Sequence, residues 1–136
     1  MSGERKPVPI NPRDLAQPRG YSNGMLAGPG RMLAIAGQIG WNAESKLVSD
    51  DFVAQFDQAL RNVAAVLREA GGVPTDLIML RIYLTDKKLY TARLKEIGRS
   101  YREHMASHYP AMALLQVADL LEPGALVEIE GLAVIP

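Results

Sequence analysis

The hydrophobic positions of the chain repeat with two different periods, and these periods predict the order of its strands and helices. Unbroken or alternating apolar runs, which are typical of strands, cover residues 32–36, 77–85, about 111–118 and about 126–135. Between the first three of these runs, apolar residues recur three and four positions apart, as on one face of a helix. The predicted order is strand or hairpin, helix, strand, helix, strand, strand.

The first helix has the clearest boundaries. Ser49 is expected as its N-cap, and the two aspartates that follow stand in a first turn that favours negative charge. The apolar stripe extends over residues 52–67 and stops at Gly71-Gly72.

The second helix follows the strand over residues 77–85. Asp86 is expected to cap it, and apolar residues recur at helical intervals from Leu89 or Tyr90 to Met105, before the break at Pro110. The last two strands are separated by a turn over residues 121–124.

Two helices on one face of a single sheet predict an α+β two-layer fold. The other sheet face carries Leu and Val, so oligomerisation is the economical way to bury it. At 136 residues the chain is expected to be one domain, residues 1–136, whose first 24 residues, rich in Pro, Gly and polar side chains, form an extended arm.

The last strand carries the most informative side chains. Alternation places Glu128 and Glu130 on the same face as Leu132 and Val134, so this face is acidic at one end and apolar at the other. Such a mixture indicates a pocket or a subunit interface, where a carboxylate near apolar walls is suited to proton transfer. The alternative interpretation is a structural carboxylate paired with an Arg or Lys of a neighbouring element or subunit.

Composition narrows the function classes. The absence of cysteine excludes disulfides, thiolate metal sites and a cysteine nucleophile, and it fits the cytoplasm. No apolar run suggests a signal peptide or a membrane span. Residues 87–108 carry a net charge of +4 and residues 109–136 a net charge of −4, yet the zero overall charge and few aromatics argue against a nucleic-acid partner.

Other motifs carry weaker signals. His104 and His108 have the spacing of metal ligands on a helix, but surface positions or a helix C-terminus explain them better, and no metal or cofactor is expected. Trp41 is expected to pack at a loop or interface, with stacking on a planar substrate as the alternative. Gly37 would allow a ligand to approach the backbone at a strand end.

Several short segments, taken in order, resemble the RidA/YjgF/UK114 family. They are Gly20-Tyr21-Ser22, Ala36-Gly37-Gln38-Ile39-Gly40, Asn62 with Leu67 and Ala70-Gly71, Tyr83-Leu84-Thr85-Asp86, Pro110-Ala111 and Val127-Glu128-Ile129-Glu130. The resemblance implies a chorismate-mutase-like subunit and a homotrimer whose sheets form a central β-barrel. A small-molecule ligand would then bind in three clefts between subunits.

The best-known members of that family are deaminases that hydrolyse enamines or imines. The resemblance implies that Glu130 helps to activate water and that Tyr21, Ala36, Gly37 and Met112 line the substrate site. The family places an Arg, which grips the substrate carboxylate, where this chain has Met112, and a Ser where it has Ala36. Methionine cannot replace a charged bidentate donor.

Three hypotheses follow from this departure. The first is a deaminase with an altered substrate, for example a larger unsaturated product of aromatic-ring catabolism, docked by Arg19, Arg31, Arg81 or Trp41. The second is a binding or regulatory trimer without hydrolysis. The third is a ribonuclease, which the neutral charge and the lack of a His or Lys constellation make the weakest.

Overall fold

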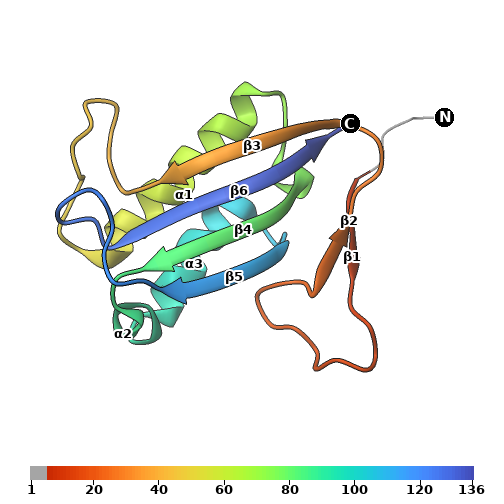
Figure 1. Cartoon of the computed structure of the whole chain (residues 1–136), viewed down its shortest axis with the longest axis horizontal. Coiled ribbons are helices and arrows are strands. Elements are labelled where there is room, and N and C mark those ends of the chain that lie inside the picture. Colours follow the sequence, from red (N-terminus) through yellow and green to blue (C-terminus); the bar gives the residue numbers. More distant parts are fainter. Residues whose placement is uncertain (1–5) are drawn as a thin grey trace.

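Four strands form one mixed sheet (Figure 1). The structure is a computed structural model and describes residues 6–136. The order across the sheet is β3 (Arg31–Gln38), β6 (Val127–Ile135), β4 (Leu77–Leu84) and β5 (Ala111–Gln116). β6 is antiparallel to both of its neighbours, whereas β4 and β5 are parallel. The four predicted strands are confirmed, although β3 is longer than predicted and β5 is shorter.

The helices α1 (Phe52–Glu69) and α3 (Leu94–Met105) lie together on one face of the sheet (Figure 1). Their apolar stripes and the inward side chains of the strands make the core. The core side chains that are 1% exposed or less include Phe56, Leu60, Leu67, Leu80, Met105 and Ile129. The α+β two-layer fold with a mixed sheet covered on one face is therefore confirmed.

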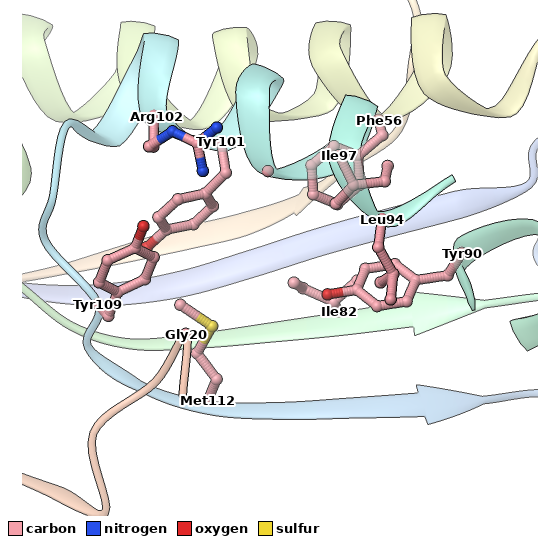
Figure 2. A pocket seen from close by; sticks show the side chains of 11 residues that line it. Gly20, Phe56, Ile82, Tyr90, Leu94, Ile97, Tyr101, Arg102, Tyr109 and Met112 are labelled. Carbon is pink, nitrogen blue, oxygen red and sulfur yellow. The ribbon is translucent and has the colours of Figure 1, made fainter. Parts of the chain in front are cut away.

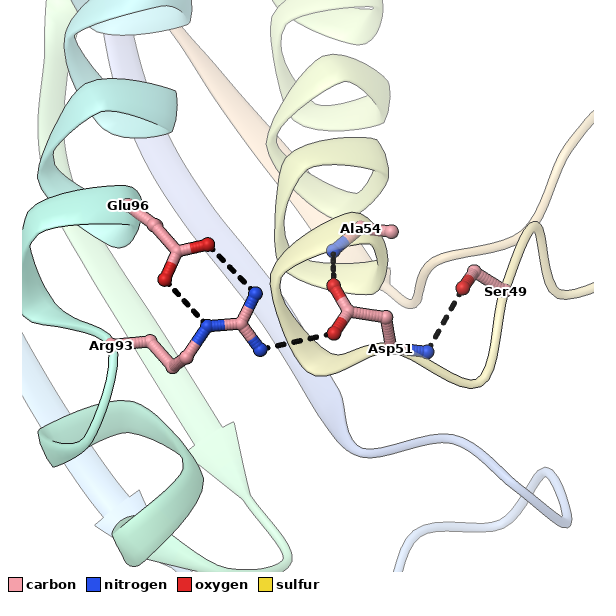
Figure 3. Close-up of polar contacts among 5 residues, drawn as sticks. All are labelled: Ser49, Asp51, Ala54, Arg93 and Glu96. Carbon is pink, nitrogen blue, oxygen red and sulfur yellow. Dashed lines mark hydrogen bonds and ion pairs between the residues drawn. The ribbon is translucent and has the colours of Figure 1, made fainter.

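The start of α1 differs from the prediction. Asp51, not Ser49, is the N-cap, because its carboxylate accepts a hydrogen bond from the backbone N–H of Ala54 at 3.1 Å. Ser49 Oγ instead accepts from the N–H of Asp51 at 2.9 Å, which fixes the turn before the helix (Figure 3). The two aspartates thus precede the first turn of the helix, and the prediction that placed them inside it was wrong.

The single second helix that the periodicity predicts is broken in two. Asp86 caps α2 (Lys87–Thr91), as expected, but α3 begins only after Arg93, whose φ of −130° is not helical. The guanidinium of Arg93 binds both oxygens of Glu96, at 2.6 and 2.7 Å, and the capping carboxylate of Asp51, at 3.0 Å (Figure 3). These bonds join the starts of α1 and α3. Leu94, at the first position of α3, is 55% exposed, although the apolar repeat placed it on the core stripe.

The N-terminal arm leads into a pair of short strands and returns to the sheet. β1 (Val8–Ile10) pairs antiparallel with β2 (Gly24–Leu26), a pairing that the sequence did not predict; residues 1–5 of the predicted arm lie outside the described residues. Ser22 forms a parallel bridge with Ala111 at the start of β5, and its hydroxyl donates to the carbonyl of Tyr109 at 2.6 Å. The arm therefore passes beside the edge strand of the sheet.

The sheet face opposite the helices is uncovered in the single chain. Met32 on β3 is 71% exposed and Leu115 on β5 is 44% exposed, while Met79, Arg81 and Tyr83 of β4 are half-buried. This outer face carries both apolar and charged side chains. Among residues 6–136, no helix combines the length and the apolar character needed to cross a membrane.

Candidate functional site

Glu130 lies on the outer face, held by two side chains of the adjacent strand. In the antiparallel pairing of β6 with β4, Glu130 is opposite Arg81 and Glu128 is opposite Tyr83. The hydroxyl of Tyr83 donates a hydrogen bond of 2.5 Å to Glu130 Oε1, and Arg81 Nη1 lies 3.7 Å from Oε2. The Glu130 side chain is 35% exposed, so this paired carboxylate still reaches solvent.

The pairing changes the ionisation of the tyrosine. The hydrogen bond to Glu130 raises the pKa of Tyr83 above its ordinary value, and burial and the negative charge of the carboxylate act in the same direction. Tyr83 therefore remains a protonated donor at neutral pH. One of the two interpretations of Glu130 was a carboxylate paired with an Arg of a neighbouring element. The structure shows this pairing within the chain, with Arg81 of β4.

Ala36 and Gly37 lie in an irregular part of β3, where its pairing with β6 shifts between Ile35 and Gln38. Both residues are exposed. A Cβ atom at Gly37 would overlap the carboxylate of Glu128, so the missing side chain leaves room for this glutamate. The approach of a ligand to the backbone at Gly37 stays a prediction.

Met112 belongs to a different surface. It pairs with Leu80, packs against the core and lines a pocket on the helix side of the sheet, with a volume of about 200 Å³ (Figure 2). The other lining residues come from the arm, α1, β4, α2, α3 and the segment before β5: Gly20, Phe56, Ile82, Tyr90, Leu94, Ile97, Gly98, Tyr101, Arg102 and Tyr109. Met112 and Glu130 therefore lie on opposite faces of the sheet, and one chain does not bring them together.

The remaining candidates lie at separate places along the sheet. Tyr21, 39% exposed, is adjacent to Ser22 and thus lies near the start of β5, close to the Met112 pocket. Of the four side chains expected to replace the missing cation, Arg81 pairs with Glu130 on the outer face. Arg31 is on β3 at the opposite edge of the sheet, and Trp41 is in the loop after β3. Neither of these two, nor Arg19, is among the residues that line the Met112 pocket.

The sequence did not predict where three polar residues of these surfaces lie: Arg81 was expected only as a docking group, Tyr83 only as part of a family-like segment, and Arg102 had no expected role. Arg81 and Tyr83 alternate along β4 and so share a face, but only the strand pairing places them beside Glu130. Arg102 lines the Met112 pocket. The one feature of the sequence that could have indicated its position is Gly98, four residues before it in the same helix.

The two histidines are not free surface groups. His104 Nε2 lies 2.9 Å from Asp57 Oδ1, and the His104 side chain is 10% exposed. Burial favours a higher pKa for Asp57, but hydrogen bonds from Ser100 and His104 outweigh it and lower the pKa below its usual value. His108 Nε2 lies 2.8 Å from the carbonyl of Leu77. Both histidines are half-buried, and His104 lies in the last turn of α3, which is one of the two positions expected.

Comparisons with known proteins agree with this fold. The family model described as Endoribonuclease L-PSP matches residues 13–135. The 2-iminobutanoate/2-iminopropanoate deaminase of Capra hircus is 32% identical over 135 residues, which cover 98% of this chain and 88% of that protein.

Two solved structures illustrate the similarity in three dimensions. The protein YyfB of the conserved Rid family from Yersinia pestis, described as of unknown function, has a TM-score of 0.85 and 34% identity, covering 96% of this chain and 99% of its own. E. coli TdcF, solved with bound serine, has a TM-score of 0.68 and 27% identity, covering 97% and 94%. With a family model that spans nearly its whole length, this chain belongs to the RidA/YjgF family.

Proposed function

We propose that the protein is an enamine or imine deaminase that hydrolyses a C=N bond to a carbonyl compound and ammonia. The observation that carries the proposal is the partly exposed carboxylate of Glu130, which a tyrosine and an arginine hold in place on the outer sheet face. The deaminase name of relatives about one-third identical to this chain supports the same reaction class.

The chemistry requires one group that both accepts and returns a proton. Water adds to the carbon of the C=N bond, and its two protons pass in turn to the nitrogen: the first as the carbinolamine forms, the second as the C–N bond breaks, ammonia leaves and the carbonyl forms. An enamine first gains a proton on carbon and loses one from nitrogen to become the imine. Glu130 is the group proposed to carry these protons, and Tyr83 and Arg81 orient its two oxygens.

A site that uses both Glu130 and the Met112 pocket requires two copies of the chain, because the two lie on opposite faces of the sheet. We propose a homotrimer in which the outer faces form a central β-barrel and each cleft lies between two subunits. The exposed Met32 and Leu115 support this arrangement, since burial of such side chains favours association.

The substrate is proposed to differ from a small 2-imino acid. Met112 offers no charge for a carboxylate, and the pocket around it is mostly apolar and aromatic. An enamine or imine with a larger unsaturated body suits these walls better. The ligand-binding trimer without hydrolysis is the second candidate, and it is favoured by the fact that both oxygens of Glu130 already have partners.

Ammonia release tests the proposal. The wild type is given enzymatically generated 2-aminoacrylate and, separately, a 2-aminomuconate-type enamine, and ammonia is measured against the reaction without protein. We expect release above background with the larger enamine and its loss in Glu130→Gln. Glu122→Gln, in an exposed turn, is the matched control and should keep the wild-type rate. Equal rates in wild type and Glu130→Gln would refute the role of Glu130, and background rates with every enamine would favour the binding trimer.

A further inference from the structure

Arg102 is the only arginine or lysine among the residues that line the Met112 pocket (Figure 2). It is on α3, across the pocket from the strand that carries Met112. Within residues 6–136, its guanidinium has no carboxylate within 4.0 Å and no hydrogen-bond acceptor, whereas Arg61, Arg81 and Arg93 each pair with a carboxylate. The pocket therefore has a cation in its wall whose donors remain available.

A glycine in the same helix leaves room for this cation. Gly98 precedes Arg102 by one helical turn, and a Cβ atom at Gly98 would lie 3.1 Å from Arg102 Nη1 and 3.8 Å from Cζ. The guanidinium thus lies against the helix at the position where another residue would have its side chain. Glycine weakens a helix interior, so its presence in α3 calls for a local reason, and this contact with the pocket arginine provides one.

The other walls of the pocket favour a flat apolar body. The rings of Tyr101 and Tyr109 are stacked, with centroids 5.1 Å apart and planes inclined by 10°. The hydroxyl of Tyr101 donates to the carbonyl of His108 at 2.6 Å, which fixes its ring. Met112 and Ile82 add apolar surface below the tyrosines (Figure 2). A volume of about 200 Å³ accommodates a ligand of roughly one ring with a short side chain.

We propose that Arg102 binds the anionic group of the ligand and thereby takes over, from a different element, the role of the cation missing at Met112. The ligand then places one carboxylate, carried on a planar, unsaturated or aromatic body, in this pocket. A carboxylate matches the fork of a guanidinium, whereas the second charge of a phosphate would find no other cation among the lining residues. This inference rests on the proposed function, because it names the substrate class of the same site.

A matched pair of ligands tests the role of Arg102 without catalysis. Cinnamate and cinnamamide share one planar body and differ in charge, and their binding to the full-length protein is measured by isothermal titration calorimetry. We expect the wild type to bind cinnamate at least about tenfold more tightly than cinnamamide, since hydrogen bonds to a charged group add this much. Arg102→Gln should abolish this preference, and Arg102→Lys should keep part of it.

Arg99→Gln is the control, because Arg99 is on the same helix, carries the same charge and does not line the pocket. It should keep the wild-type preference. Three results would overturn the inference. The preference could survive Arg102→Gln, it could be lost equally in Arg99→Gln, or the wild type could bind neither ligand at millimolar concentration. If the wild type releases ammonia but Arg102→Gln does not change the ligand preference, only this inference is refuted. If the ligands bind as expected but no enamine is hydrolysed, only the proposed function is refuted.

Discussion

Gln55 provides a sharp test of how the strand that carries Glu130 is held in place. Its side chain is fully buried in α1. Its Nε2 donates to the carbonyls of Ser49 and Gly124 at 2.9 and 3.0 Å, and its Oε1 accepts from the N–H of Leu126 at 2.8 Å. One amide thus ties the start of α1 to the turn that leads into β6. Gln55→Met keeps the length of the side chain and removes all three bonds.

The expected loss of stability follows from the groups left without a partner. A buried polar group without a hydrogen bond costs about 1–3 kcal/mol. Gly124 is exposed, and Ser49 and Leu126 are half-buried, so water can replace part of the lost hydrogen bonds. We therefore expect a total nearer about 3 kcal/mol than the sum of three full penalties. For a chain of this size, that lowers the melting temperature by about 10 °C.

Urea unfolding followed by circular dichroism measures this difference, at one fixed protein concentration because oligomer stability depends on concentration. Gln58→Met is the matched control, since Gln58 is on the same helix and its amide makes one bond, to Asn62 at 2.9 Å. It should cost less than about 1 kcal/mol. Equal losses in the two variants, or a loss below about 1 kcal/mol for Gln55→Met, would show that the amide of Gln55 does not hold the turn before β6 in place.

Two further predictions concern the outer face and the helix layer. Tyr83 has a raised pKa in the folded chain, so its bond to Glu130 stabilises the fold below the ordinary tyrosine pKa of 10.0, and this stabilisation is lost as pH rises through the folded value. Glu130→Gln should therefore shift one tyrosine to a lower pKa in an ultraviolet alkaline titration, and an unchanged curve would contradict this. Gly40→Ala should destabilise the fold by about 2 kcal/mol or more, because its Cβ would lie 2.6 Å from Gln55 Cα and 2.8 Å from its carbonyl oxygen. Gly71→Ala, at φ +86° with nothing within 4 Å, should cost only the left-handed strain of about 1 kcal/mol, and equal losses would argue against the steric account.

The strands and their faces followed from the sequence wherever one face was apolar and the other was not. Alternation along β6 placed Glu128 and Glu130 on the outer face, as the structure has them. In β5 both faces carry apolar residues, so alternation could not decide on which face of the sheet Met112 lies. The structure places it on the helix side, opposite the face that carries Glu130. The partners of Glu130 were hidden for a related reason, because the register of β4 against β6 depends on pairing across the sheet.

The helix layer shows the opposite limit. The apolar repeat from Leu89 to Met105 continues through the break at Arg93, because periodicity records which residues are apolar and not where the backbone changes direction. One of the bonds that stabilise the break joins Arg93 to Asp51, which is 42 residues away in the sequence. Such a contact between distant residues leaves no local signal, and neither does the position of Arg102 in the pocket wall.

The proposal that the site is completed between two copies of the chain can be tested by mixing two inactive variants. Glu130→Gln removes the carboxylate, and Gly98→Trp fills the Met112 pocket with an indole ring while leaving Glu130 intact. Chains are combined in equal amounts, unfolded and refolded together, and ammonia release from the larger enamine is measured. We predict about a quarter of the wild-type rate, because a site works only where an intact carboxylate of one chain meets an intact pocket of its neighbour. A mixture as inactive as either variant alone would contradict the claim.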